Sequence, residues 1–260
     1  MVWAHVVAGA LTGFVVGLTG VGGGALMTPI LLLVFGMAPH TAIGTDLWFA
    51  ATTKLAITRV HRGKNLIDWP ILRQMWAGSL TASALTLIWM NYQSMNPRST
   101  DLLRGAIAIA VCITATGMFA QKRLHAMARR RHMADGPAIL QPILTVVIGA
   151  ILGVLVTLTS VGAGALGAVL LVFLYPTRLS PPRLVATDIA HAIPLALFAA
   201  IGHLMTSAVD LPMLGGLLLG SIPAGVFGAR LSARLSPEIL RAALAVVLLI
   251  IGIKMAIDVF

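Results

Sequence analysis

The 260-residue sequence has one cysteine and little charge or aromatic character: 10% of its residues are charged and 6% are aromatic. A single cysteine excludes an intramolecular disulfide, and Cys112 lies in an apolar segment without a nearby histidine, which predicts a packing role. The histidine spacings are not typical of a metal site, and no nucleophile is paired with a base. We therefore expect neither an enzyme nor a bound cofactor.

Hydrophobic residues make up 58% of the chain. Ten apolar segments recur from end to end, at 3–18, 25–36, 42–58, 70–92, 102–120, 142–158, 165–175, 184–202, 211–229 and 239–257. This pattern predicts an all-α, polytopic helical protein in the lipid bilayer of the cytoplasmic (inner) membrane. The first Lys or Arg is Lys54, so we expect the first segment to be retained rather than cleaved as a signal peptide.

The two halves of the chain repeat each other. Residues 18–25 (LTGVGGGA) are nearly copied by residues 158–165 (LTSVGAGA). Further matches lie at an offset of 142: Thr45-Asp46 with Thr187-Asp188, His61 with His203, Asp68 with Asp210, Pro70 with Pro212, and Gly78-Ser79 with Gly220-Ser221. Each copy has five segments, an odd number, so we expect inverted-topology repeats with short, glycine-broken helices. A single integral membrane domain (1–260) would then contain repeat one at about 3–120 and repeat two at about 138–257.

The basic residues favour opposite orientations of the two repeats. The loop at 59–73 holds four Lys or Arg, whereas its counterpart at 204–214 holds none. With the 59–73 loop inside, 14 of the 18 basic residues fall on that side, Arg98, Arg104 and Lys254 fall outside, and Lys54 lies within an apolar segment. The positive-inside rule then predicts a cytoplasmic linker at 121–137 and both termini outside. We expect the basic run 129–132 in this linker to fix orientation and not to bind nucleic acid.

Glycines interrupt the apolar pattern at equivalent places in the two halves. Paired breaks indicate a transporter site, because they expose backbone polar groups at membrane depth. The half-helices beginning near Gly24 and Gly164 would each offer free N–H groups to an anion. The predicted binding residues at the breaks are Thr19, Gly22, Gly23, Gly24, Thr159, Ser160, Gly162, Ala163 and Gly164. The alternative is that these glycines only permit close helix crossing, as predicted for Gly9, Gly13 and Gly17.

A few ionisable residues lie within the apolar segments. Asp46 and Asp188 are candidates for proton coupling, with His191 on the helical face of Asp188. The alternatives are helix capping by the acids and simple packing of the histidine. Lys54 is either a fixed charge for an anion or a side chain that snorkels to the surface. Thr45 and Thr187, before the acids, complete the predicted binding residues; His61, His203, Asp68 and Asp210 are predicted to cap loops.

Several motifs together carry a family resemblance. They are Gly-x-x-x-Gly, then Gly-Val-Gly-Gly-Gly leading to Pro29, His40-x-Ala-x-Gly-Thr45, Asn65-x-x-Asp68-Trp69, Gly78-Ser79 and, in the second half, Gly220-Ser-Ile-Pro-Ala-Gly225. Over nearly its whole length the chain resembles the TauE/SafE sulfite exporter family of membrane permeases. The resemblance implies a secondary transporter or exporter of a small anion, sulfite or an organosulfonate.

One departure from the family pattern concerns the acids. Where this family often has a small Ser after the Thr, this chain has Asp46 and Asp188, which favours proton coupling. An anion channel of the same fold is the main alternative, and an intramembrane enzyme is the other. A homodimer is one assembly that the sequence leaves open.

Overall fold

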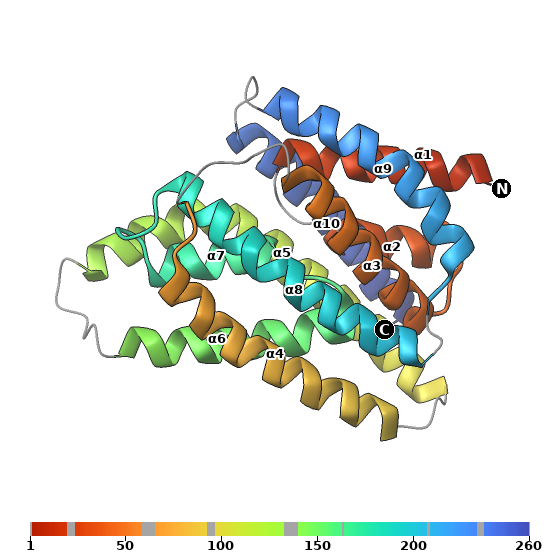
Figure 1. Cartoon of the computed structure of the whole chain (residues 1–260), viewed down its shortest axis with the longest axis horizontal. Helices are drawn as coiled ribbons and strands as arrows, with labels where there is room; N and C mark the ends of the chain where they lie inside the picture. The colour runs from red at the N-terminus through yellow and green to blue at the C-terminus, as the bar shows by residue number, and fades with distance from the viewer. Residues whose placement is uncertain are drawn as a thin grey trace.

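The computed structural model describes residues 2–19, 24–58, 66–92, 97–132, 140–162, 164–206, 209–232 and 237–259. Every regular element within these residues is an α-helix (Figure 1). The helices are α1 (Val2–Thr19), α2 (Gly24–Leu33), α3 (Pro39–Thr58), α4 (Trp69–Tyr92), α5 (Pro97–His132), α6 (Leu140–Thr159), α7 (Ala165–Leu174), α8 (Pro181–Met205), α9 (Leu211–Leu231) and α10 (Pro237–Val259). Each predicted apolar segment corresponds to one of them, so the all-α prediction is confirmed.

Two boundaries differ from the sequence-based expectation in ways that affect the site. Helices α3 and α8 begin at Pro39 and Pro181, before the first predicted apolar residues at 42 and 184. Proline suits the first turn of a helix, because its missing N–H would have no partner there. Helix α5 also continues to His132, through the first part of the predicted linker at 121–137; residues 133–139 lie outside the described residues.

The outer surface of the structure is apolar, as a lipid-facing surface requires. Four described helical segments are long and apolar enough to cross a membrane: Thr100–Gln121, Leu140–Thr159, Pro182–Met205 and Leu211–Leu231. On α4 the large side chains of Leu85, Ile88 and Trp89 are exposed. The prediction of a polytopic helical membrane protein is therefore confirmed.

Helices of the first half of the chain pack against helices of the second half. The pairs are α1 with α9, α4 with α6, α3 with α8, and α5 with α10. In Figure 1 α1 and α9 lie at the upper right, α4 and α6 lie at the bottom, and α3 and α8 lie between these pairs. The short helices α2 and α7 contact α3 and α8, respectively. The interior of the molecule is thus built around α3 and α8.

Glycines allow the α1–α9 pair to approach closely. A Cβ atom added at Gly9, Gly13 or Gly17 would overlap a backbone carbonyl oxygen of α9. Gly149 and Gly153 of α6 have the same relation to carbonyl oxygens of α4. The prediction that Gly9, Gly13 and Gly17 form a helix-crossing series is confirmed.

Helices α3 and α8 run in opposite directions through the interior. Near the start of α3, Thr45 Oγ1 accepts a hydrogen bond of 3.0 Å from the backbone N–H of Asp210, which follows the end of α8. Near the start of α8, Thr187 Oγ1 accepts a bond of 3.0 Å from the N–H of Asp68, which follows α3. Thr45 matches Thr187 and Asp68 matches Asp210 in the sequence repeat, so the two contacts are equivalent to each other.

Candidate functional site

The two acids of the sequence repeat lie inside the molecule. Asp46 is 0% exposed and Asp188 is 3% exposed. Asp46 lies seven residues after Pro39, the first residue of α3, and Asp188 lies seven residues after Pro181, the first residue of α8. An N-cap residue precedes the first helical residue, so the alternative that these acids cap their helices is wrong. Both helices begin earlier than their apolar pattern, which carries the acids into the helix interior.

Asp46 binds the short helix that follows the first glycine break. Its Oδ2 atom accepts a 3.1 Å hydrogen bond from the backbone N–H of Thr28 and a second bond from the Thr28 hydroxyl. Its Oδ1 atom has no hydrogen-bond partner among the described residues. No role was predicted for Thr28 from the sequence. The one feature that sets it apart there is a hydroxyl group within the apolar segment 25–36.

Asp188 approaches the other short helix, α7, in a similar way. A Cβ atom at Gly167 would overlap Asp188 Oδ1, so the glycine makes room for the carboxylate. Within the described part of the chain, Asp188 Oδ1 also lacks a hydrogen-bond partner. Each acid therefore lies against a short helix and has one carboxylate oxygen available for another group.

Lys54 is the buried cation of this region. It is 4% exposed, and its charge interacts with the charges of Asp188 and Asp46. Its burial favours the interior interpretation over snorkelling to the surface. The repeat counterpart of Lys54 is Ala196, so the lysine breaks the symmetry of the two halves. We call Asp46, Lys54 and Asp188 the charged trio.

The second glycine break lies beside this charged trio. Ser160, Gly162 and Gly164 have φ angles of 58°, 111° and 132°, in the left-handed range that glycine adopts most readily. Gly164 is the N-cap of α7, and its N–H donates to the Gly162 carbonyl at 2.7 Å. In the first turn of α7, the N–H groups of Gly167 and Ala168 donate to the Gly162 and Gly164 carbonyls at 3.4 and 3.0 Å, and the positive end of the helix dipole faces the break.

Ser160 connects this break to the first half of the chain. Its hydroxyl group lies near the Asp46 carboxylate, and it has no hydrogen-bond partner within the described residues. Helix α2 begins at Gly24, as predicted, whereas Gly22, Gly23 and Ala163 lie outside the described residues.

The other predicted binding threonines have structural partners. Thr19 and Thr159 donate to carbonyl oxygens of their own helices at 2.8 and 2.6 Å. Thr45 and Thr187 accept the backbone hydrogen bonds that join the two halves. These four hydroxyl groups are thus bonded to backbone groups, whereas the Thr28 hydroxyl contacts Asp46 directly.

His191 lies one helical turn after Asp188 and is 1% exposed. Its Nε2 atom is 2.9 Å from Ser79 Oγ of α4, and its ring lies within electrostatic range of Lys54. The contact links α8 to α4 through two polar side chains in an apolar interior. Ser79 was found in the sequence repeat, but no role was predicted for it.

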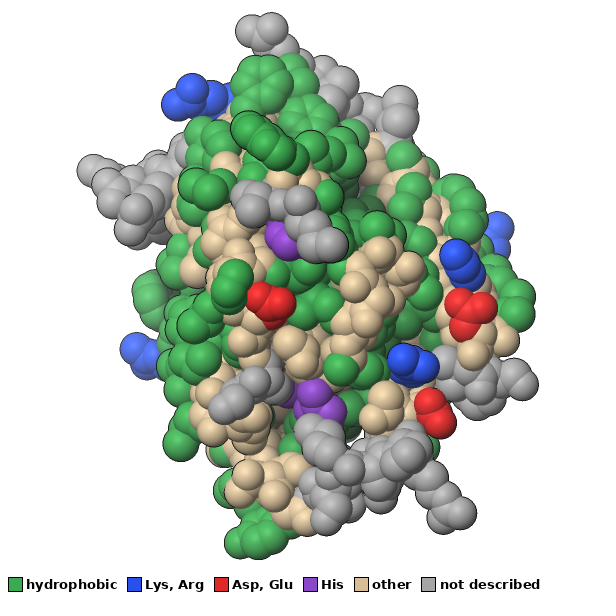
Figure 2. All heavy atoms as spheres, turned by 90° about the vertical axis from the view of Figure 1, so that its right-hand side faces the viewer, with side chains coloured by type: hydrophobic (Ala, Val, Ile, Leu, Met, Phe, Trp, Pro, Cys, Tyr) green, Lys and Arg blue, Asp and Glu red, His purple; other side chains and the backbone are tan. Residues whose placement is uncertain are grey.

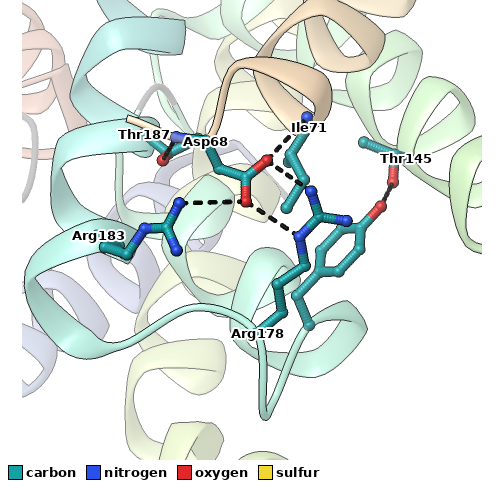
Figure 3. Close-up of polar contacts among 7 residues, drawn as sticks. Asp68, Ile71, Thr145, Arg178, Arg183 and Thr187 are labelled. Carbon is teal, nitrogen blue, oxygen red and sulfur yellow. Dashed lines mark hydrogen bonds and ion pairs between the residues drawn. The ribbon is translucent and has the colours of Figure 1, made fainter. Parts of the chain in front are cut away.

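An ion-pair cluster joins the two halves where α8 begins (Figure 3). Arg178 donates from Nε and Nη2 to the two carboxylate oxygens of Asp68, at 3.0 and 2.9 Å. Arg183 Nη2 lies 3.6 Å from Asp68 Oδ2, and the Arg178 guanidinium lies 5.7 Å from the centre of the Tyr175 ring. At the opposite end Asp210 has no such arginines, since Gly36 and Thr41 occupy the equivalent sequence positions.

The predicted loop-capping residues divide into two groups. Asp68 accepts a bond from the N–H of Ile71, and Asp210 caps α9 by accepting from the N–H of Met213, at 3.4 and 2.9 Å. The prediction for His203 is wrong, because this residue lies within α8, is 1% exposed and donates from Nε2 to the Thr157 carbonyl at 3.0 Å. His61 lies outside the described residues.

Comparison with known proteins agrees with this architecture. The family described as sulfite exporter TauE/SafE matches residues 5–255. The probable membrane transporter protein YjnA of Bacillus subtilis (strain 168) is 34% identical over 248 residues, 95% of this chain and 96% of that protein. A probable membrane transporter protein of Xylella fastidiosa (strain 9a5c) is 32% identical over 103 residues, 40% of each chain. No solved structure matches the chain.

Proposed function

The chain belongs to the TauE/SafE sulfite exporter family and is a membrane transporter, and we propose that it moves a small sulfur-containing anion together with protons. Sulfite or an organosulfonate is the substrate class. The observation that carries the proposal is the charged trio, in which a buried lysine interacts with two buried acids that lie against the short helices α2 and α7. Buried ionisable groups within a membrane protein mark ion and proton pathways.

The groups around the charged trio suit an oxyanion. Lys54 supplies a positive charge, and the start of α7 supplies backbone N–H groups and a positive dipole end. Thr28 and Ser160 add hydroxyl groups that can donate hydrogen bonds to the oxygens of a small anion. Sulfite and the sulfonate group both present several acceptor oxygens on one small centre, which matches this set of donors.

The charge of the trio links anion binding to protons. With both acids ionised, two negative charges and one positive charge leave a net charge of −1, which repels an incoming anion. A proton on either acid makes the trio neutral, so the anion binds better to the protonated form. Thermodynamic reciprocity then requires that a bound anion also favours proton uptake. This linkage is the basis of the proposed coupling.

We propose that the two halves are inverted repeats in the cytoplasmic membrane, with both termini outside. The opposite directions of α3 and α8 and the uneven distribution of basic residues support this arrangement. Trp69 and Leu211 occupy equivalent repeat positions, and both are exposed. In a Cys112→Ala background, Trp69→Cys should react with impermeant thiol reagents from the inside and Leu211→Cys from the outside. Reaction of both from one side would disprove the inverted arrangement.

The transport proposal is tested by uptake of radiolabelled sulfite into proteoliposomes under an imposed pH gradient. We expect accumulation above the external concentration, and its loss in Lys54→Gln, which removes the buried positive charge. The matched control is Lys254→Gln, because Lys254 is an exposed lysine of α10. Sulfite flow that never exceeds equilibrium would instead indicate a channel. Wild-type activity in Lys54→Gln would disprove the role of the charged trio.

The substrate within this class is identified by thermal stabilisation. Purified protein is heated with sulfite, sulfate, thiosulfate, taurine, sulfoacetate or sulfolactate. A ligand stabilises the folded protein in proportion to the logarithm of its concentration over Kd, so the transported anion should raise the melting temperature most. A matching loss of that shift in Lys54→Gln would connect the anion to the charged trio.

A further inference from the structure

Buried hydroxyl and imidazole groups extend from the charged trio toward the end of the molecule where α8 ends. His191 Nε2 lies 2.9 Å from Ser79 Oγ, and Ser83, one turn further along α4, lies 2.7 Å from Thr157 Oγ1 of α6. The Thr157 carbonyl accepts from His203 Nε2 at 3.0 Å. We call these five residues the polar row. All five are at most 1% exposed.

The polar row leads to the surface through a second histidine. The rings of His203 and His40 lie 6.3 Å apart between centroids, and His40, at the start of α3, is partly exposed. Figure 2 views this end of the molecule and shows histidine side chains reaching the surface among hydrophobic ones. The row therefore extends from His191, one helical turn from Asp188, to one face of the molecule; its hydroxyl and imidazole groups both donate and accept protons, and the Thr157 carbonyl, which only accepts, holds His203 beside the Thr157 side chain.

Three residues of the polar row, His191, Ser83 and Thr157, lack a polar counterpart in the other repeat, whereas Ser79 is matched by Ser221 and His203 by His61. Ser83 and Thr157 meet between α4 and α6, whereas the matching contact between α9 and α1 joins Gly225 to Gly17. His191 is matched by Phe49. The crossing of α4 and α6 thus does not require hydroxyl groups at this point, because the equivalent crossing of α9 and α1 has two glycines there. Buried polar groups at such positions call for a functional explanation.

We infer that the polar row is the route by which protons reach Asp188 from the side of the membrane where α8 ends, an inference that rests on the proposed proton-coupled transport. A proton enters at His40 and His203, and it leaves the row by forming an O–H bond on Asp188. The aqueous phase on that side supplies the proton, and no other reactant is consumed. Ser79 and Ser83 are about 6 Å apart along the helix axis, so the proposed route needs one water molecule between them.

The groups that face the polar row from neighbouring helices are consistent with proton movement from His40 toward Asp188. Asp188 faces Lys54 of α3 and Gly167 of α7, and Lys54 also faces His191. His203 faces His40 of α3 and the Thr157 carbonyl of α6. Helix α4 contributes the hydroxyl groups of Ser79 and Ser83 to these contacts. Among these groups, Asp188 is the acid at the inner end of the row.

The test removes the central hydroxyl pair without touching the charged trio. The double variant Ser83→Ala/Thr157→Val deletes both partners, so neither is left unpaired, and the glycine pair of the other repeat indicates that the crossing tolerates their loss. The control is Thr114→Val. Like Thr157, Thr114 is 0% exposed and its hydroxyl donates to a carbonyl of its own helix.

Two transport modes are measured in proteoliposomes with radiolabelled sulfite. Exchange of internal for external sulfite at equal pH requires no net proton movement, whereas uptake driven by a pH gradient does. We expect the double variant to keep wild-type exchange and to lose pH-driven uptake by about ten-fold or more, because a positioned proton relay is missing. Thr114→Val should retain both activities.

Each alternative outcome has a distinct meaning. Wild-type pH-driven uptake in the double variant would overturn the proton route while leaving the proposed transport intact. An equal loss of exchange and uptake would also overturn it, because the hydroxyl groups would then serve anion binding or folding. Wild-type protein that exchanges sulfite but never responds to a pH gradient would overturn the proton coupling and the route together.

Discussion

Substitution of Asp188 by asparagine should uncouple anion binding from pH. Asp188 is 3% exposed and interacts with the charge of Lys54, so its own charge acts in a poorly screened environment. For an anion about 5 Å away and an effective dielectric constant of about 20, the repulsion from one carboxylate is about 3 kcal/mol. An energy of about 3 kcal/mol corresponds to a change of about 100-fold in Kd.

The sign of the pH effect follows from the charge. A proton on Asp188 removes a negative charge, so wild-type protein should bind sulfite more tightly as the pH falls, by at most about ten-fold per pH unit for one linked proton. Asp188→Asn is neutral at every pH and should bind with little pH dependence. Its pH-driven uptake should be lost, while sulfite exchange at equal pH persists.

The assay is the Kd of sulfite for purified protein across the neutral pH range. Sulfite itself takes up a proton in this range, so the variant is compared with wild type at each pH, which cancels the change in the ligand. The control is Asp258→Asn, which neutralises an exposed acid of α10. If Asp188→Asn keeps the wild-type slope, Asp46→Asn is the next variant. A full slope in both variants would refute the electrostatic linkage.

Four further predictions concern packing and the ends of the helices. Gly13→Ala should lower the free energy of unfolding by about 1–3 kcal/mol, because its Cβ overlaps the Ser221 carbonyl. Gly117→Ala should be neutral or stabilising in the same thermal-unfolding assay, since its Cβ meets only side chains at 3.7–3.8 Å. Gly164→Val should abolish sulfite binding and also reduce thermal stability, because φ is 132° at this position. Arg178→Gln should cost about 1–2 kcal/mol in unfolding free energy by breaking a two-point ion pair that is partly exposed to solvent.

Much of the fold could be predicted from the sequence because a lipid environment restricts backbone structure strongly. Backbone polar groups in hydrocarbon must be bonded internally, so each long apolar run becomes a helix. The helix-crossing glycines were predictable for a related reason: small residues every fourth position form a groove along one helix face. The starts of α3 and α8 were placed too late, because Pro39 and Pro181 were not counted with the apolar residues.

The late placement of these helix starts also affected the role predicted for Asp46. Placing the helix start near Asp46 made a capping role reasonable, whereas in the structure the helix already contains this residue and its carboxylate binds Thr28 of α2. Thr28 lies 18 residues away in the sequence, and no local pattern indicates that the two side chains meet. The same holds for Ser79 and His191, which are 112 residues apart.

The sequence by itself determined the helical class and the identity of the ionisable residues in the interior, because composition and periodicity govern partition into lipid, and its motifs indicated the family by resemblance. Asp46 and Lys54 lie eight residues apart on one helix, close to two turns and hence on one face. Only the tertiary structure decided that Asp188 joins them, and that Ser83 and Thr157 continue as a buried polar row. These contacts depend on which helices cross, at what depth and in which direction. The crossings also decide which charged side chains are buried, and burial in turn determines the free energy of each charge.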